Sequence, residues 1–265
     1  MPLGNAAPLV RLEHIRKVFN QDTVSESYVF RDFNFTISRG EFISVVGSNG
    51  SGKTTLLNLL CGTLPADDGV IMMNGKDITH LPEYRRSAFI GRVFQDPAKG
   101  TCPELTILEN LSLAYNKGKP FGLGRGVSRR NTDYFKSQLV LLKLGLEDKL
   151  ELQVGALSGG QRQALALLIA TMTPIELLVL DEHTAALDPK SSENVMALTD
   201  TVIREKNLTA IMVTHNLRYA VEYGNRLVMM HQGAAVIDTL DGKKEDYSIN
   251  SLLKVFNEIS IECGN

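Results

Sequence analysis

The hydrophobic pattern of this chain is dominated by three short apolar runs, at residues 42–46, 177–180 and 210–214. None of them alternates cleanly between apolar and polar residues, so we expect strands that are covered on both faces, as in a parallel α/β sheet. In open α/β sheets, ligands bind beyond the carboxyl ends of the strands. We expect the residues that follow the runs to converge at that edge of the sheet. They are Gly47, Asp181 with Glu182, and His215.

Two antiparallel hairpins are also predicted. The first runs through residues 70–73 and turns at Asn74-Gly75, and the second runs through residues 226–230, turns at Gln232-Gly233 and returns along residues 234–239. Asn-Gly is the stronger of the two turn signals because it favours the left-handed backbone of a tight hairpin turn.

The middle of the chain follows a different pattern. Between about residues 96 and 157 the β signal disappears and a helical pattern replaces it, as at residues 134–144, which predicts an inserted helical subdomain. Residues 116–130 are rich in Gly, Lys and Arg and predict an exposed loop within it. A last apolar pattern, at residues 252–259, predicts a closing helix.

Composition narrows the class of protein. With 265 residues and 43% hydrophobic content, the chain can bury a full core in one large domain or in a domain and a subdomain. The net charge of −2 gives no overall attraction to nucleic acid, and no nucleic-acid partner is expected. The three cysteines lack metal-binding spacing, which argues against disulfides and zinc and suits a reducing compartment.

No membrane span or signal peptide is predicted. The longest nearly apolar run, residues 164–172, is far shorter than the roughly 18 residues that a membrane span needs. The N-terminus lacks a charged start followed by an apolar run. We therefore expect a cytoplasmic protein, and another polypeptide would have to cross any membrane at which it works.

A glycine-rich loop that follows the first run matches the phosphate-binding pattern G-x-x-x-x-G-K-[ST]; its residues are Gly47, Ser48, Asn49, Gly50, Ser51, Gly52, Lys53, Thr54 and Thr55. A strand before the loop and a helix-compatible stretch after it are the setting that this motif requires. The glycines let the backbone curl so that its N–H groups face inward, as an anion-binding nest. Lys53 would reach the β- and γ-phosphates, and the Thr54 hydroxyl would ligate Mg²⁺. We call residues 47–55 the phosphate loop.

GTP is an alternative nucleotide to ATP. The segment Asn116-Lys117-Gly118-Lys119 superficially matches the guanine-reading pattern N-K-x-D, but Lys119 replaces the required aspartate. The segment also lies in the predicted exposed loop rather than after a strand. ATP is therefore the expected nucleotide.

Two carboxylates, Asp181 and Glu182, end the second apolar run. Asp181 would hold the hydration shell of Mg²⁺ and Glu182 would polarise the attacking water, because phosphoryl transfer depends mainly on positioning and electrostatics. An Asp-Glu pair alone is usually just solvated, but its place after an apolar strand, in a chain with a phosphate loop, favours function. His215 ends the third run and could hydrogen-bond the γ-phosphate, although the residues alone equally allow a structural histidine.

A second glycine-rich segment, Leu157-Ser158-Gly159-Gly160-Gln161-Arg162-Gln163, precedes a helical stretch, and we call it the signature segment. Its S-x-x-Q pattern predicts a capping box with Ser158 as the N-cap. Two adjacent glycines in a first helical turn disfavour a helix, which suggests that something approaches the backbone closely. A helix N-terminus with a serine hydroxyl also binds anions, so capping and phosphate recognition are compatible.

The order of these motifs resembles the ATP-binding subunit of an ABC transporter over about residues 9 to 240. The matching segments are the phosphate loop, Val93-Phe94-Gln95-Asp96-Pro97, the signature segment, residues 177–182, Ala186-Leu187-Asp188-Pro189 and Val213-Thr214-His215. The resemblance implies an α/β fold, with a P-loop NTPase core around a mixed sheet, an N-terminal antiparallel β subdomain and an inserted helical subdomain. The core would comprise residues 1–95 and 158–265, and the helical subdomain residues 96–157.

The resemblance also implies roles for single residues. Gln95 would touch Mg²⁺ and the water site, and His215 would be the switch histidine, so that the catalytic set is Glu182, His215, Gln95 and Lys53. The metal ligands would be Thr54, Gln95 and Asp181. Phe19 would stack on adenine, with Tyr28 as the fallback. A second subunit would contribute to the same ATP through Ser158, Gly159, Gly160, Gln161 and Asp188.

The implied function is ATP hydrolysis by a dimer of this chain that closes around two ATP and drives a separate permease, at the cytoplasmic face of the cell membrane. Import of a small solute such as an amino acid is favoured, because importers more often keep the ATPase as its own chain. An extracytoplasmic substrate-binding protein would then be a further partner. The alternative is a soluble ABC ATPase without a transport role, for example in iron–sulfur cluster assembly.

One departure from the family is His183, where proline is usual. We expect it to add a titratable group near the rim of the active site. Residues 183–189 are similar to a bacterial subgroup whose importers are linked to tryptophan or related compounds.

Overall fold

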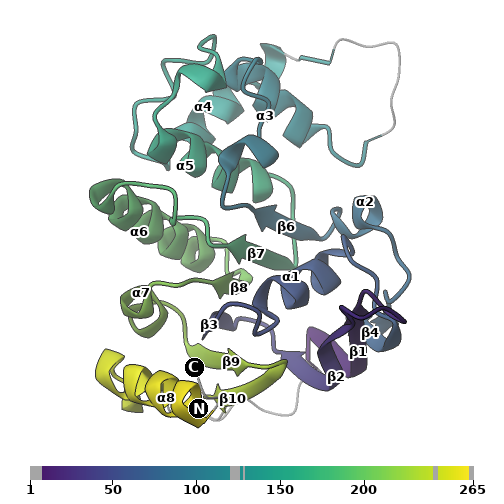
Figure 1. Cartoon of the computed structure of the whole chain (residues 1–265). Helices are drawn as coiled ribbons and strands as arrows, with labels where there is room; N and C mark the ends of the chain where they lie inside the picture. Colours follow the sequence, from purple (N-terminus) through teal and green to yellow (C-terminus); the bar gives the residue numbers. More distant parts are fainter. Residues whose placement is uncertain (1–7, 120–125, 128, 241–243, 263–265) are drawn as a thin grey trace. The chain divides into compact units, whose positions relative to one another are not determined.

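The computed structural model describes residues 8–119, 126–127, 129–240 and 244–262 of the chain (Figure 1). The chain divides into two compact units, one made of residues 1–87 and 207–265 and the other of residues 88–206. We call them the loop unit and the signature unit, after the glycine-rich segment that each contains. The division at residues 95/96 and 157/158 stays a prediction.

The loop unit contains an antiparallel sheet near the N-terminus (Figure 1). Its strands, in spatial order, are β2 (Ser27–Ile37), β1 (Val10–Phe19), β4 (Asp68–Met73) and β5 (Lys76–Asp77). The turn between β4 and β5 is Asn74-Gly75, with φ of 52° and 72°. The predicted hairpin and the antiparallel N-terminal subdomain are therefore confirmed, whereas the apolar pattern had not singled out β1 and β2.

A second set of strands in the loop unit lies in the order β10 (Ala234–Asp238), β9 (Arg226–His231), β3 (Phe42–Gly47) and β8 (Thr209–Val213). β3 pairs in parallel with β8 and β9, whereas β9 and β10 form the predicted antiparallel hairpin. Every residue of β3 and of β8 is buried, as expected for strands covered on both faces. The mixed sheet is thus confirmed.

Helices of the loop unit are α1 (Lys53–Cys61), α2 (Glu83–Arg86), α7 (Leu217–Glu222) and α8 (Ile249–Glu262), with a short 3₁₀ helix at Lys244–Asp246. α8 includes the predicted closing helix. Its Leu252 is fully buried in a cluster with Val46 of β3, Ala220 of α7 and Met229 of β9. The apolar positions of α8 therefore anchor the C-terminal helix to the sheet that carries the phosphate loop.

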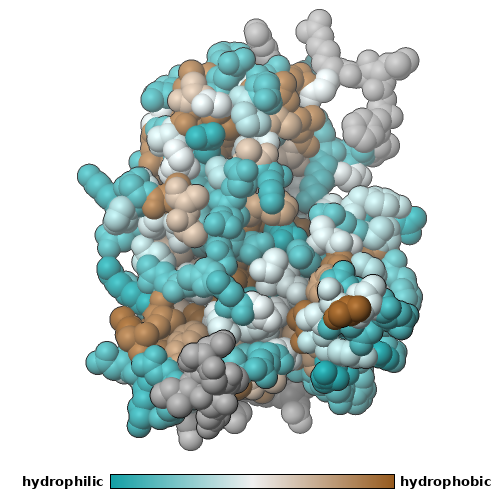
Figure 2. Space-filling view, in the orientation of Figure 1, coloured by the Kyte–Doolittle hydropathy of each residue, from teal (hydrophilic) through white to brown (hydrophobic). Residues whose placement is uncertain are grey.

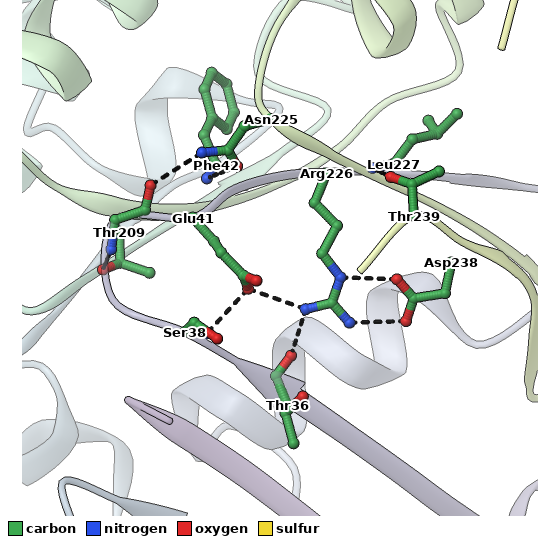
Figure 3. A network of polar contacts seen from close by, with 11 residues as sticks. Thr36, Ser38, Glu41, Phe42, Thr209, Asn225, Arg226, Leu227, Asp238 and Thr239 are labelled. Carbon is green, nitrogen blue, oxygen red and sulfur yellow. Dashed lines mark hydrogen bonds and ion pairs between the residues drawn. The ribbon is translucent and has the colours of Figure 1, made fainter. Parts of the chain in front are cut away.

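Arg226, the first residue of β9, is buried and lies at the centre of a polar network (Figure 3). Its guanidinium donates to both carboxylate oxygens of Asp238, at 2.8 and 2.7 Å, and to Glu41 Oε2 at 2.9 Å. It also donates to the Thr36 carbonyl oxygen at 2.8 Å. Because two carboxylates and a carbonyl oxygen hold the buried Arg226 guanidinium, this network fixes the base of the β9–β10 hairpin.

The signature unit has two parallel strands, β6 (Ile90–Val93) and β7 (Leu177–Asp181). Its helices are α3 (Ile107–Tyr115), α4 (Thr132–Val140), α5 (Gly159–Ala170) and α6 (Pro189–Glu205), with 3₁₀ helices at Pro97–Lys99, Arg129–Asn131 and Val154–Ala156. Ile107 and Leu111 of α3, Phe135 of α4 and Leu165 of α5 are fully buried in one core. Described residues between 96 and 157 form helices and turns, apart from one isolated β-bridge.

The helix expected over residues 134–144 ends earlier, at Val140. Lys143 and Gly145 have φ of 55° and 64°, which an α-helix cannot accommodate. Part of the predicted loop at residues 116–130 lies outside the described residues. None of the helices in the described part of the chain combines the length and apolar composition that crossing a bilayer requires.

Candidate functional site

The phosphate loop connects β3 to α1, and its curl depends on left-handed glycines. Gly47, Gly50 and Gly52 have φ of 154°, 77° and 103°. Gly52 is the N-cap of α1 and provides no side-chain cap. Such a helix start presents backbone N–H groups toward an anion, as the sequence predicts.

Close neighbours explain two of these glycines. A Cβ atom on Gly47 would lie 2.2 Å from the Met230 carbonyl oxygen, and one on Gly52 would lie 2.9 Å from the Phe30 ring. No heavy atom would lie within 4 Å of a Cβ on Gly50, so glycine is needed there for its positive φ and not for space. The turn of the β9–β10 hairpin also holds the loop, because the Gly233 N–H donates to the Ser51 carbonyl oxygen at 3.1 Å.

Lys53 stabilises the curl from inside. Its buried ammonium donates to the carbonyl oxygens of Gly47 and Ser48, both at 2.8 Å. Ser51 Oγ is buried and accepts or donates no hydrogen bond within the described residues. Thr54, the second residue of α1, is exposed. The loop therefore offers an ammonium, an unused buried hydroxyl and uncapped N–H groups, which is a suitable donor set for phosphate oxygens.

The two candidates for adenine stacking lie on neighbouring strands, where Phe19 pairs with Ser27 and Tyr28 with Val18. Each has an exposed fraction of 36%. The Arg31 guanidinium lies 4.2 Å from the centre of the Tyr28 ring, whereas the Lys17 ammonium lies 5.7 Å from that of Phe19. A stacked guanidinium occupies one face of the Tyr28 ring, so Phe19 stays the better candidate.

His215 lies at the same edge of the sheet as the start of the phosphate loop. Val45 of β3 pairs with Val213 of β8, so Gly47 and His215 each lie two residues beyond this pair. The Thr214 N–H donates to the Val45 carbonyl oxygen at 3.1 Å, which holds the strands together up to this point. His215 itself is exposed.

In the signature unit, Gln95 and Glu182 lie beyond a pair of residues on two parallel strands, as Gly47 and His215 do in the loop unit. Val93 of β6 pairs with Leu180 of β7, and each predicted catalytic residue lies two positions beyond. Gln95 is exposed. Glu182 has φ of 48°, a left-handed backbone that is uncommon outside glycine and is often found at functional sites.

Asp181, the last residue of β7, forms an ion pair that the sequence analysis missed. The Arg92 Nη2 atom of β6 lies 2.7 Å from Asp181 Oδ2, and the two side chains are only 11% and 16% exposed. No pattern within the sequence could reveal this pair, because it depends on the register of two strands 89 residues apart.

The signature segment starts α5 with the predicted capping box. The Gln161 N–H donates to Ser158 Oγ at 3.3 Å, and the Ser158 N–H donates to Gln161 Oε1 at 3.1 Å. A Cβ on Gly160 would lie 3.1 Å from Ser191 Cβ, and one on Gly159 would lie 3.2 Å from Leu187. The close approach that the glycines suggest is therefore present within the chain, at the start of α6.

Two further polar residues support this region. Asp188 is the N-cap of α6 and accepts a hydrogen bond from the Ser191 N–H at 3.0 Å. Hydrogen bonds from Ser191 lower the pKa of Asp188. Gln163 is fully buried and donates from Nε2 to the Phe94 carbonyl oxygen at 2.9 Å, which ties α5 to the residue before Gln95. Sequence reasoning gave Gln163 no role.

The expectation for His183 was wrong. The His183 side chain is 2% exposed, and burial lowers its pKa to about 4. His183 is therefore neutral at pH 7 and is not a titratable group at the rim of the active site. Thr199 Oγ1 donates to the Val195 carbonyl oxygen at 2.8 Å and lies 3.1 Å from His183 Nε2. The hydroxyl has one proton, so the histidine donates from Nε2. His183 thus ties the segment after β7 to α6.

The predicted site residues fall in both units. Phe19, the phosphate loop and His215 belong to the loop unit; Gln95, the signature segment, Asp181, Glu182 and Asp188 belong to the signature unit. That the two groups serve one nucleotide stays a prediction.

Comparisons with known proteins agree with these motifs. The family model described as ABC transporter matches residues 30–185. The tyrosine transport ATP-binding protein of Clostridioides difficile is 44% identical over 94% of this chain and 98% of its own length. The spermidine/putrescine import ATP-binding protein PotA of Haemophilus influenzae is 34% identical over 87% of this chain, which spans 58% of that relative.

Solved structures show the same fold. A dimeric ATP-binding cassette in a post-hydrolysis state, bound to ADP and Pi, matches with a TM-score of 0.72 and 27% identity over 86% of this chain and 97% of that one. A cassette of the cbiONQ complex from Clostridium perfringens matches in fold, with a TM-score of 0.75 and 23% identity over 95% of both chains. This chain belongs to the ABC transporter family, as an ATP-binding subunit that hydrolyses ATP to power transport.

Proposed function

We propose that two copies of this chain close around two ATP and drive a separate permease that imports a small solute such as an amino acid. The observation that carries the proposal is the identity of 44%, over almost the whole of both chains, with a relative named for tyrosine transport. The relatives named for polyamine and hemin import are only 33–34% identical.

ATP would bind at the phosphate loop, where Lys53 and the N–H groups of α1 meet the phosphates and Phe19 stacks on adenine. Mg²⁺ would be held through Thr54, Gln95 and Asp181. The described residues contain no group of three or more His, Cys, Asp or Glu that could hold a metal. This suits Mg²⁺, which usually takes one or two carboxylates and otherwise binds phosphate oxygens and water. When bound, Mg²⁺ supplies positive charge to the phosphates.

Hydrolysis would depend on Glu182 as the group that orients and deprotonates the attacking water, with Gln95 and His215 positioning the water and the γ-phosphate. The second copy would contribute Ser158, Gly159, Gly160 and Gln161, with Asp188 linking the two sites. The Ser158 hydroxyl at the start of α5 supports this role, because it can face an anion while it caps the helix.

The permease would bind the helical part of the signature unit, at the cytoplasmic face of the membrane. Leu113, Val140 and Leu141 are apolar yet 54%, 53% and 38% exposed. Figure 2 shows hydrophobic residues at the surface of this part, around α3 and α4. Exposed apolar side chains of this kind suit a protein partner. An extracytoplasmic substrate-binding protein would deliver the solute.

The test is solute uptake by cells that lack this chain. We expect uptake of labelled aromatic amino acids to fall, wild-type protein to restore it, and Glu182→Gln not to restore it. That variant should lower ATP turnover by about 100-fold or more while it still binds ATP. Labelled putrescine and hemin are the matched controls. Unchanged uptake of amino acids would refute the proposed substrate, and restoration by Glu182→Gln would refute the role of Glu182.

Co-purification tests the partners. Full-length protein isolated from membranes should bring a multi-span permease with it, and Leu113→Glu should weaken that association without changing ATP affinity. Recovery with cluster-assembly proteins and without a permease would favour a role outside transport.

A further inference from the structure

We infer that Arg92 is a positioning residue that keeps divalent cations off Asp181 unless a nucleotide accompanies them. The inference rests on the proposed role of Asp181 in holding Mg²⁺. Arg92 lies outside the motifs that define the site.

The register of β6 and β7 explains why these side chains meet. Arg92 pairs with Val179, and paired residues of neighbouring strands project to the same face of a sheet. Residues two positions further along project to that face again, which adds Phe94 and Asp181. The long Arg92 side chain therefore reaches the next position of the neighbouring strand. The sheet itself directs the guanidinium to the carboxylate.

Packing holds the guanidinium in place. The Arg92 Cζ atom lies 4.7 Å from the centre of the Phe94 ring, and the Nη2 atom lies 2.7 Å from Asp181 Oδ2. A guanidinium that stacks on a ring and donates to a carboxylate retains little rotamer freedom. The ion pair is a fixed feature of this strand end rather than one of many surface arrangements.

The low exposure of Arg92 strengthens the effect of its charge on a cation at Asp181. The side chains of Arg92 and Asp181 are 11% and 16% exposed, so water and salt screen the pair less than they screen surface pairs. A divalent cation at Asp181 would share the carboxylate with the guanidinium and be repelled by it. Mg²⁺ also loses its water reluctantly and usually needs phosphate oxygens as ligands. The negative charge of a nucleotide would offset the repulsion, so the metal would arrive with ATP rather than before it.

The experiment measures Mn²⁺ binding to full-length protein without nucleotide, through loss of the EPR signal of free Mn²⁺. Arg92→Met should bind Mn²⁺ about tenfold or more tightly than wild type, because a positive charge that repels the cation at close range is removed. Adding Asp181→Asn to Arg92→Met should abolish the gain. Arg204→Met removes an exposed charge from an ion pair on α6 and should leave the affinity unchanged.

Two outcomes would overturn the inference: equal Mn²⁺ affinity in Arg92→Met and wild type, or a gain that survives Asp181→Asn. If Arg92→Met does not fold, as judged by circular dichroism, Arg92→Gln keeps a hydrogen-bond donor without the charge and carries the same expectation. ATP binding by wild type, measured with a fluorescent analogue in EDTA and in Mg²⁺, distinguishes failure of the proposed function from failure of the role of Arg92. Failure to bind ATP would refute the proposed function, whereas ATP binding with unchanged Mn²⁺ affinity would refute only the role of Arg92.

Discussion

The two glycine-rich helix starts of this protein differ in how their backbone donors are used. α1 begins after Gly52, which has a left-handed backbone and no capping side chain. α5 begins after Ser158, which is extended and closes a capping box with Gln161. The backbone N–H groups at the start of α1 are left open to an anion. At the start of α5, the Ser158 side chain already accepts a hydrogen bond from one such N–H group.

The glycines also serve different ends. In the phosphate loop, Gly47 and Gly52 adopt positive φ and have neighbours that would lie 2.2 and 2.9 Å from an added Cβ. In the signature segment, Gly159 and Gly160 are helical, and an added Cβ would lie 3.2 and 3.1 Å from its neighbours. Glycine therefore shapes a binding backbone in the first case and lets α6 approach α5 in the second.

The largest expected effect on ATP binding concerns the open helix start. Lys53→Met removes the ammonium and its two hydrogen bonds to the loop, so ATP affinity should fall by about 10- to 100-fold. Fluorescence titration with an ATP analogue measures it, and Lys76→Met, on exposed β5, is the matched control. Wild-type affinity in Lys53→Met would contradict our assignment of the phosphate loop.

Alanine substitution tests the difference between the glycines. Gly47→Ala should lower the free energy of unfolding by about 3 kcal/mol, because β3 and β9 must separate to admit a methyl group beside a carbonyl. Gly160→Ala should change it by less than about 1 kcal/mol, since better helix propensity offsets the contact with Ser191. Urea unfolding of both variants measures the two changes in the free energy of unfolding. Equal losses would mean that both segments use glycine for the same reason.

Sequence patterns predicted the elements whose signal is local. The apolar runs became β3, β7 and β8, and Ser158 with Gln161 became a capping box. β1 and β2 were not singled out, and their pairing contains register shifts around Ile15 that interrupt a simple alternation. Four-residue β6 is too short to give a periodic signal.

The residues that sequence reasoning missed or misjudged depend on contacts between distant segments. Arg92 reaches Asp181 through strand register, and Arg226 pairs with Glu41, which precedes β3, and with Asp238 of β10. His183 follows Glu182 in sequence, which suggested a titratable group near the rim of the active site, but packing against Thr199 buries it. Local sequence does not report such burial.

Acid should weaken the contact of His183 with Thr199 of α6. Burial lowers its pKa from 6.5 to about 4, so between these values the unfolded chain binds more protons than the folded one. Stability therefore falls as the pH drops, by about 2 kcal/mol between pH 7 and pH 5. Urea unfolding in EDTA should show this loss in wild type but not in His183→Gln, whereas His80→Gln, at an exposed position, should keep it. A parallel loss in His183→Gln would assign the effect to other groups.

Substitutions at Ser158 separate its roles as a helix cap and as a phosphate contact. Ser158→Ala removes the cap and should lower the free energy of unfolding by about 1 kcal/mol without changing ATP affinity of the single subunit. Ser158→Asp keeps a good cap but places a negative charge where the phosphate of the other subunit would lie, so it should retain stability and prevent ATP-driven dimerisation. Size-exclusion chromatography in the Glu182→Gln background measures the dimer, and Ser158→Arg, which should also block closure while nucleotide still binds, provides a bulky comparison. A Ser158→Asp protein that dimerises like its parent would leave Ser158 as a helix cap alone. Of the two glycine-rich helix starts, the open start of α1 would then be the one that contacts phosphate.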